Sequence, residues 1–135
     1  MDLDRALTIS ASGMAAQSAR LRVIAENIAN RDSTGQSPGA EPYRRKTISF
    51  GARLDRALDV ATVRVSRIGE DPRAFPERFE PHHPAADARG YVRTPNVDSL
   101  VETMDMREAN RSYSANLAVL DTTRGMLLRA IEALR

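Results

Sequence analysis

The sequence predicts a mainly α-helical fold with a small β insertion: long N- and C-terminal helices that pair as a coiled-coil hairpin, with a small antiparallel β unit between them. Apolar residues repeat every seven positions in both end segments, and short alternating stretches separated by Gly- and Pro-containing turns fill the middle of the 135-residue chain. The predicted boundaries are 1–30 for the first helix, 31–42 for an irregular connector, 43–95 for the β-rich region and 96–135 for the second helix.

The first predicted helix has its apolar residues at sevens: Leu7, Met14, Leu21 and Ile28. No proline interrupts the segment, and several alanines favour a helix. Gly13 costs about 1 kcal/mol relative to alanine in a helix interior. We therefore interpret Gly13 as either a close packing contact or a joint in the helix.

The middle of the chain begins with residues 31–42, whose Asn, Asp, Ser, Gly and Pro are typical of an irregular connector. Strands are expected over four stretches: 43–50, 61–68, 75–80 and 90–94. In the second of these, Val63 and Val65 are expected to point inward. Residues 53–60 fit either a helical turn or a strand.

The only basic run, Arg44-Arg45-Lys46, lies in the first expected strand. Charged residues on an edge strand oppose pairing with other sheets. We favour a solvated strand edge for this run over a binding site.

The second predicted helix carries the longest repeat of seven: Met106, Tyr113, Leu120, Leu127 and Leu134. A strict spacing of seven keeps an apolar stripe in register with a partner helix. Leu117 and Ile131 add a second column to this stripe. Asn96 is a possible N-cap, and Ser99 with Glu102 has the spacing of a capping box, so the helix can begin at either.

The two apolar stripes allow two interpretations. An ordinary helical hairpin with its own core is one. In the other, two paired helices bury too little surface to be a stable fold, and each keeps part of its apolar face for neighbouring subunits. No third segment of comparable length and periodicity completes a bundle within the chain.

Composition argues against several classes of function and excludes some of them. Lys and Arg total 20 against 18 Asp and Glu, and the charges do not gather into the basic stripe that nucleic-acid binding requires. The chain has no cysteine, which rules out disulfides, thiolate metal sites and cysteine nucleophiles. The N-terminus lacks the layout of a secretory signal peptide, and no apolar run approaches 18 residues. These features predict a soluble protein without membrane insertion, in the cytoplasm or exported without a cleaved signal.

No catalytic or metal-binding arrangement is evident. His82 and His83 are adjacent and have no third ligand at a readable spacing, so we interpret them as loop residues. Neither a phosphate-binding loop nor a nucleophile elbow is present. The sequence therefore predicts no enzyme activity, no cofactor, no metal and no small-molecule substrate.

Several segments resemble the axial proteins of the bacterial flagellum. Residues 12–30, SGMAAQSARLRVIAENIAN, are similar to the N-terminus common to these proteins. Tyr43 to Lys46, and Gly90-Tyr91-Val92 followed by Pro95-Asn96-Val97, resemble the proximal rod members specifically, as does the run from Met104 to Asn116. The resemblance extends over nearly the whole chain in collinear order, with little that is diagnostic in 51–80.

The resemblance implies a structural subunit of the basal-body rod, which joins the membrane-embedded ring to the distal rod and hook. Its implied partners are other rod subunits, its own copies and the flagellar type III export apparatus, and its implied location is the rod where it crosses the periplasm. The expected assembly interface comprises Leu7, Met14, Leu21, Ile28, Met106, Tyr113, Leu120, Leu127 and Leu134. A possible inter-subunit loop comprises Asn30, Ser33, Thr34, Tyr43, Arg44, Arg45 and Lys46.

Two other functions remain open on sequence grounds. The first is a cytoplasmic helical-hairpin adaptor that binds one partner helix. The second is a basic protein that contacts nucleic acid or peptidoglycan.

Overall fold

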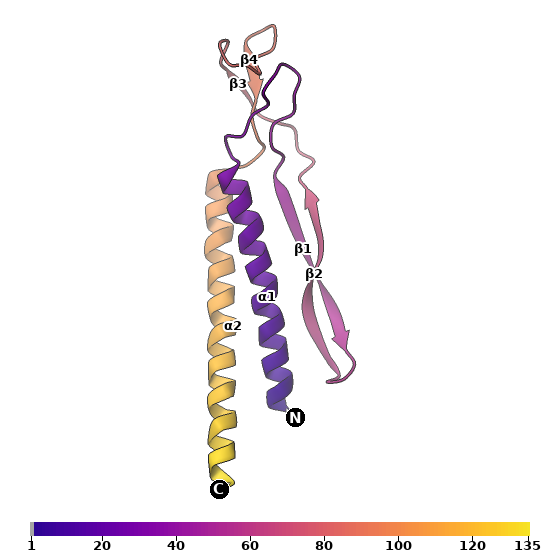
Figure 1. Cartoon of the computed structure of the whole chain (residues 1–135), viewed down its shortest axis with the longest axis vertical. Helices are drawn as coiled ribbons and strands as arrows, with labels where there is room; N and C mark the ends of the chain where they lie inside the picture. The colour runs from indigo at the N-terminus through magenta and orange to yellow at the C-terminus, as the bar shows by residue number, and fades with distance from the viewer. Residues whose placement is uncertain (1) are drawn as a thin grey trace. The chain divides into compact units, whose positions relative to one another are not determined.

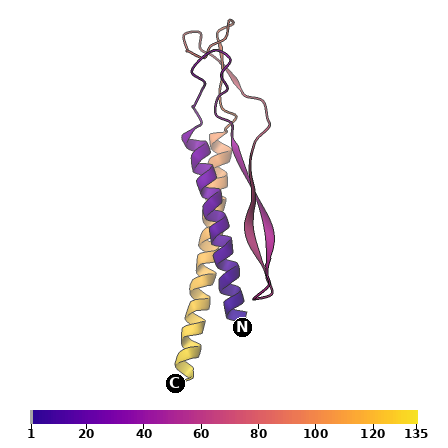
Figure 2. The same cartoon turned by 45° about the vertical axis from the view of Figure 1, so that its right-hand side comes forward.

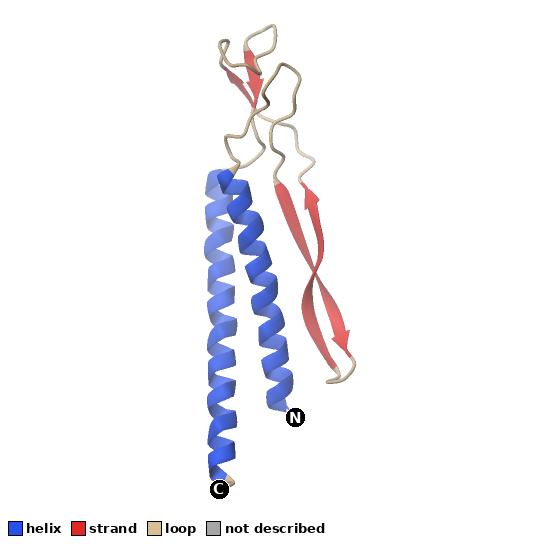
Figure 3. Ribbon diagram, viewed as in Figure 1, coloured by secondary structure: helices blue, strands red, loops and turns tan. Residues whose placement is uncertain are grey.

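A computed structural model describes residues 2–135 and contains two long helices and two small sheets (Figures 1 and 3). The elements in chain order are α1 (Asp2–Ala29), β1 (Lys46–Asp55), β2 (Val60–Glu70), β3 (Glu77–Phe79), β4 (Tyr91–Arg93) and α2 (Ser99–Ala133). The predicted terminal helices and small antiparallel β elements are therefore confirmed. The chain divides into two compact units: a first unit of residues 2–21, 48–67 and 106–135, and a second unit of residues 22–47 and 68–105.

In the first unit, α1 and α2 run antiparallel and contact each other (Figure 2). Gly13 lies against the side chain of Asn116, and Arg20 forms an ion pair with Glu108 at 3.6 Å. A Cβ at residue 13 would lie 2.8 Å from Nδ2 of Asn116. Gly13 is therefore a close packing contact and not a joint, because α1 continues through it without interruption.

The face of α2 that α1 covers in this unit is small and polar. Its most buried positions are Ala109, which is fully buried, and Thr123, which is 6% exposed. Asn116, midway between them, is half-buried. Ser10 of α1 is likewise buried, at 4% exposure.

The apolar repeat lies beside this face and is only half-buried within the chain. That half-buried set in the first unit comprises Leu7, Met14, Leu21, Met106, Tyr113, Leu120 and Leu127. Leu117 and Ile131 are 40% and 50% exposed. These two residues, expected to form a second column of the stripe, are therefore not the residues that α1 covers. The column that α1 covers is Ala109, Asn116 and Thr123, whose small or polar side chains allow α1 to approach closely.

Leu134 is 88% exposed because α2 is longer than α1. Gly13 lies opposite Asn116, and Arg20 lies near Glu108. Because the helices are antiparallel, each step back along α1 matches one step forward along α2, so Asp2 lies opposite roughly residue 127. Residues 128–135 therefore extend past the end of α1, as Figures 1 and 2 both show. We call this segment the α2 overhang.

Strands β1 and β2 form a long antiparallel hairpin. Ser66 Oγ donates to the carbonyl of Ser49 at 3.1 Å, and Thr62 Oγ1 donates to the carbonyl of Arg53 at 2.9 Å. Residues 53–55 complete β1 and 56–59 form the turn, which resolves the ambiguity over 53–60. The expected inward position of Val63 is wrong, since it is 41% exposed; its backbone N–H instead donates to Ser12 Oγ of α1 at 3.2 Å.

Strands β3 and β4, in the second unit, form the other antiparallel pair, in which Arg78 lies opposite Val92. Val92 is fully buried, and the rings of Phe79 and Tyr91 meet edge to face with centroids 5.3 Å apart. Gly90 has φ of +86°, and a Cβ there would lie 2.9 Å from the Phe79 ring. Only glycine satisfies both the backbone conformation and the close approach.

The α1–α2 contact can be tested with a matched pair of glycine substitutions. We expect Gly125→Ala to raise the free energy of unfolding by up to about 1 kcal/mol through helix propensity, since the nearest atom to its new Cβ lies 3.9 Å away. Gly13→Ala should gain little or lose, because Asn116 must move and give up its 3.1 Å bond to the Ser112 carbonyl. Thermal denaturation followed by circular dichroism measures both. Equal stabilisation by the two substitutions would contradict the close contact.

Candidate functional site

The centre of the second unit is a fully buried carboxylate, that of Glu102 in the first turn of α2. Arg45 Nε donates to its Oε1, and Asn27 Nδ2 donates to its Oε2 at 3.4 Å. A buried carboxylate is costly unless it is paired and hydrogen-bonded. Glu102 therefore requires both Arg45, just before β1, and the end of α1 to be in place.

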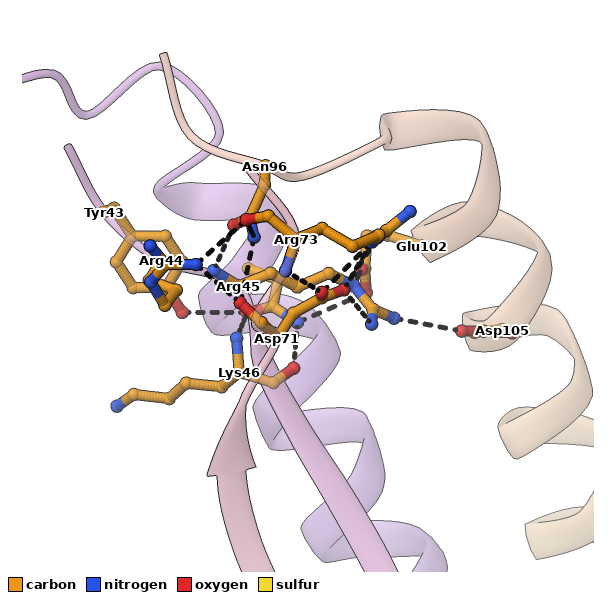
Figure 4. A network of polar contacts seen from close by, with 10 residues as sticks. Tyr43, Arg44, Arg45, Lys46, Asp71, Arg73, Asn96, Glu102 and Asp105 are labelled. Atoms are coloured by element: carbon orange, nitrogen blue, oxygen red, sulfur yellow. Dashed lines mark hydrogen bonds and ion pairs between the residues drawn. The ribbon is translucent and has the colours of Figure 1, made fainter. Parts of the chain in front are cut away.

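Arg45 joins Glu102 to two further carboxylates. Its guanidinium lies 3.5 Å from Asp71 and 3.6 Å from Asp105, and its side chain is 17% exposed. Its backbone N–H donates to Asn96 Oδ1 at 2.8 Å. The side chain and the main chain of one residue thus hold three separate segments together, as Figure 4 shows.

Asn27, which is 1% exposed, binds the main chain of Lys46 on both sides. Its Nδ2 donates to the Lys46 carbonyl and its Oδ1 accepts from the Lys46 N–H, each at 2.9 Å. Tyr43 also donates its hydroxyl to Asn27 Oδ1, at 2.8 Å. Burial, together with the nearby carboxylates of Glu26 and Glu102, raises the pKa of Tyr43 to about 12.

Asp71 is held by charged and neutral donors together. Arg73 donates to it from Nε at 2.9 Å and from Nη2 at 2.7 Å. These hydrogen bonds, with the positive charges of Arg73 and Arg45, lower the pKa of Asp71 to about 2 against the opposing effect of burial. Its main-chain carbonyl accepts from Arg44 Nη1 at 2.7 Å and from Asn96 Nδ2 at 3.1 Å.

These residues form one polar cluster around the buried Glu102, drawn in Figure 4, whose members come from α1, residues 43–45, β1, the β2–β3 loop, the β4–α2 segment and α2. The members are Asn27, Tyr43, Arg44, Arg45, Lys46, Asp71, Arg73, Asn96, Glu102 and Asp105. Arg45, Arg73 and the three carboxylates form ion pairs within the cluster. Arg44 donates instead to the main-chain carbonyls of Asp71 and Arg73, and Lys46 points away and pairs with Glu26 at 2.5 Å. Because the donors and acceptors are engaged internally, the arrangement joins segments and does not present a reactive group.

Two sequence interpretations fail in this cluster. The basic run is not a solvated strand edge: Arg44 lies 4.2 Å above the Phe75 ring, and Arg45 pairs with carboxylates. Neither Asn96 nor the Ser99–Glu102 pair caps α2. Asp98 does, accepting from the Leu100 N–H at 2.9 Å. Spacing alone identified polar residues near a helix start, but it could not tell which of them turn inward.

The other residues of the possible inter-subunit loop are tied to their own chain. Asn30 donates to the Glu26 carbonyl at 2.9 Å, and Ser33 donates to Asn30 Oδ1 at 3.1 Å. His83 accepts from the Ala85 N–H at Nδ1, so its remaining proton is on Nε2, which donates to Thr34 Oγ1 at 3.1 Å. His83 thus fastens the connector to the β3–β4 loop. Among residues 2–135, no three His, Asp or Glu side chains gather as metal ligands would.

Along residues 2–135, no helix has both the length and the apolar character needed to cross a membrane. Two family models match the chain: flagella basal body rod protein over residues 7–35, and the C-terminal region of the flagellar basal body rod FlgEFG proteins over residues 88–133.

The chain is also similar to curated relatives named flagellar basal-body rod protein FlgC. The relative from Agrobacterium fabrum is 50% identical over 133 residues, covering 98% of this chain and 96% of the relative. That from Yersinia enterocolitica is 42% identical and covers 97% of each. That from Bacillus subtilis is 37% identical and covers 93% of this chain and 94% of the relative.

The role of the cluster predicts a strong effect of Glu102→Gln. Loss of the charge leaves Arg45 buried with one partner fewer, and we expect a loss of roughly 3 kcal/mol in the free energy of unfolding. Amide exchange should accelerate in 22–30 and 96–105 as well as around 43–47, because the cluster needs the helix ends. Glu108→Gln, at an exposed pair with Arg20, should cost less than about 1 kcal/mol. Equal effects of the two changes would show that burial of Glu102 contributes nothing.

The lowered pKa of Asp71 predicts an acid-sensitive second unit. In the folded chain its pKa is about 2, below the ordinary value of 3.8. The contribution of Asp71 to the free energy of unfolding is therefore complete above about pH 4 and is lost as the pH falls through about 2. Urea denaturation between pH 2 and pH 7 should show this decline in the parent chain. In Asp71→Asn the decline should be smaller, and the free energy of unfolding should be lower than that of the parent chain across the neutral range. An unchanged acid profile in that variant would contradict the assignment.

Proposed function

The chain belongs to the FlgC family of flagellar basal-body rod proteins, and from this premise we propose that it is a structural subunit of the proximal rod. In this proposal it polymerises through its terminal helices into the shaft that transmits torque. The observation that carries this proposal is the difference between two faces of the helices. In the first unit, the positions buried between α1 and α2 are small or polar, whereas the apolar repeat beside them stays half-exposed.

The exposed apolar repeat supports assembly because burial of apolar surface is the main source of association energy. Within one chain, Ala109, Thr123 and Ser10 occupy the covered positions and provide little apolar area. Leu7, Met14 and Leu120 retain exposed area that a further helix can cover. Neighbouring rod subunits, including other copies, supply such helices in the proposed coiled-coil packing.

The hairpin provides a second surface for neighbours. Leu54 and Ile68 are 57% and 56% exposed, and Phe50 is 37% exposed. A two-stranded hairpin is marginal in water on its own, so contacts from adjacent subunits would stabilise it. We place the hairpin and the loop residues Asn30, Ser33 and Thr34 at contacts between subunits, while the terminal helices form the inner layer.

The polar cluster fits a role in transmitting force between the helices and the rest of the second unit. It fixes the end of α1 and the start of α2 to the connector by charged hydrogen bonds, so force applied to either helix reaches the rest of the second unit. Stiffness then arises from many modest contacts along the shaft and not from one strong bond.

Location and export follow from the family as part of the proposal. The subunit leaves the cell through the flagellar type III export apparatus without a cleaved signal and takes its place in the rod within the periplasm. Helices whose apolar faces are uncovered are marginal before assembly, which suits passage of a largely unfolded chain.

Leu120→Asp tests the assembly interface. Leu120 is the centre of the repeat and is half-buried within the chain. Covering a leucine side chain is worth about 1.5–3 kcal/mol, and a carboxylate there adds a desolvation cost. We expect the variant to be made and exported but to be absent from basal bodies, so that hook growth stops. Quantifying it in secreted and basal-body fractions measures this.

The matched control is Asp121→Ala, one residue along on the exposed face of α2. It should enter basal bodies like the parent chain. If Leu120→Asp also assembles with parental efficiency, the apolar repeat is not an assembly interface.

A further inference from the structure

The β3–β4 pair, in the second unit, presents one face with two exposed aromatic rings. Phe79 lies opposite Tyr91 in the register, and Glu77 lies opposite Arg93, so all four side chains point to the same face of this small sheet. Phe79 is 61% exposed and Tyr91 is 39% exposed. Val92, between Tyr91 and Arg93, points to the other face and is fully buried. The four residues therefore form one surface, which we call the aromatic face.

A pocket of about 240 Å³ lies on the aromatic face. Its lining combines three residues of this face with two from the loop before β4 and two from the connector: Glu77, Tyr91, Arg93, Ala85, Asp87, Gly39 and Ala40. The connector wall is held in place, because Arg93 Nη2 donates to the Gly39 carbonyl at 3.2 Å. Ligand pockets usually measure roughly 300–1,000 Å³, so this smaller one takes a single group and not a large ligand.

The charged side chains around the pocket balance one another. Arg89 Nη2 lies 3.3 Å from Asp87 and 3.7 Å from Glu77, and the Arg89 guanidinium lies 5.5 Å from the centre of the Tyr91 ring. Asp87 Oδ1 accepts from the Tyr91 N–H at 3.0 Å, which fixes this carboxylate at the pocket wall. Two carboxylates face two guanidiniums, those of Arg89 and Arg93. The pocket therefore favours a neutral ligand that both donates and accepts hydrogen bonds.

Exposed aromatic rings beside such a pocket suit a sugar. In a β-linked pyranose the C–H groups lie on the two faces of the ring, and the hydroxyl groups project from its edge. The C–H faces pack on aromatic rings through ordinary dispersion contacts. Phe79 meets Tyr91 edge to face, yet it keeps 61% of its surface exposed, so ring surface remains for stacking.

The polar lining of the pocket selects a ligand with hydroxyl and amide groups. An apolar side chain of another protein would bury the carboxylates of Glu77 and Asp87 without giving them hydrogen bonds, which is costly. Hydroxyl and amide N–H groups can donate to these carboxylates, and Arg93 can donate to an amide carbonyl. Ala40 and Ala85 add an apolar wall against which an acetyl methyl group can pack. An N-acetylated amino sugar carries all of these groups on one ring.

We propose that the aromatic face binds one unit of a neutral glycan of β-linked N-acetylated amino sugars, with the sugar ring against Phe79 and Tyr91 and the acetamido group in the pocket. The site lies within the second unit and uses no residue of the apolar repeat on the terminal helices. It therefore adds a ligand to the proposed rod role and does not depend on that role.

Titration of the full-length chain with chitotetraose, a soluble tetramer of β-linked N-acetylglucosamine, tests the site. In amide NMR spectra we expect shift changes confined to residues 39–40 and 77–93. Maltotetraose, which has α-linked glucose and no acetamido group, should bind at least severalfold more weakly. Phe79→Ala and Glu77→Gln should each weaken chitotetraose binding severalfold, because the first removes the stacking surface and the second removes a charged acceptor.

Phe50→Ala is the matched control, because Phe50 is also exposed, at 37%, but lies on β1 in the first unit. It should bind chitotetraose like the parent chain. Glu77→Gln keeps the shape of the side chain, so it tests the site even if truncation of Phe79 disturbs the strand pair. Amide exchange at Val92 reports whether β3 and β4 stay paired in each variant.

The outcomes separate a glycan from a protein partner and from rod assembly. An absence of shift changes at millimolar chitotetraose overturns the glycan site, as does equal binding by the parent chain and Glu77→Gln. If the parent chain binds no chitotetraose and Phe79→Ala is lost from basal bodies, another protein covers the aromatic face and the glycan proposal is wrong. The rod assembly is judged separately, by Leu120→Asp, whichever result is obtained.

Discussion

The buried Glu102–Arg45 ion pair is the constraint on which the second unit depends. Glu102 has no exposed surface, so it must be paired, and its partner Arg45 is held in turn by Asn96, Asp71 and Asp105. Asn27 extends the same network to the end of α1. Residues 43–46, the β2–β3 loop, the end of α1 and the start of α2 therefore become ordered together. No part of this network is complete without the others.

The two units use opposite kinds of contact. Polar groups inside the second unit require specific partners and so fix one arrangement of segments. In the first unit, small and polar residues such as Gly13 and Asn116 bring the helices together but bury little apolar area. The leucines beside them stay half-exposed, and in the proposed assembly other chains cover them. Polar geometry thus joins the segments of the second unit around buried apolar residues such as Val23, Ile24 and Val92. In the proposed assembly, apolar area drives association between chains.

The sequence predicted the helices and strands, because both depend on the periodicity of apolar residues. The repeat of seven located both helices, and alternation with turn residues located the two pairs of strands, although it began β1 too early and ended it too soon. The polar cluster escaped prediction because its members lie far apart in the chain and use common residue types. Glu102 has the spacing of a capping residue and Arg45 that of a surface strand, and only tertiary contacts distinguish a buried pair from two solvated side chains.

The unequal lengths of the helices have a consequence that periodicity alone does not reveal. Helices of equal length could cover each other from end to end and leave no reason for a further chain to join at their tips. With 28 residues in α1 and 35 in α2, the apolar stripe continues beyond its cover. The uncovered residues Ile131 and Leu134 belong to the same stripe as Leu127, so a partner that covers them also extends the helix pair along its axis. In the proposed assembly, a length mismatch of about two turns would be sufficient to give a two-helix subunit a direction of growth.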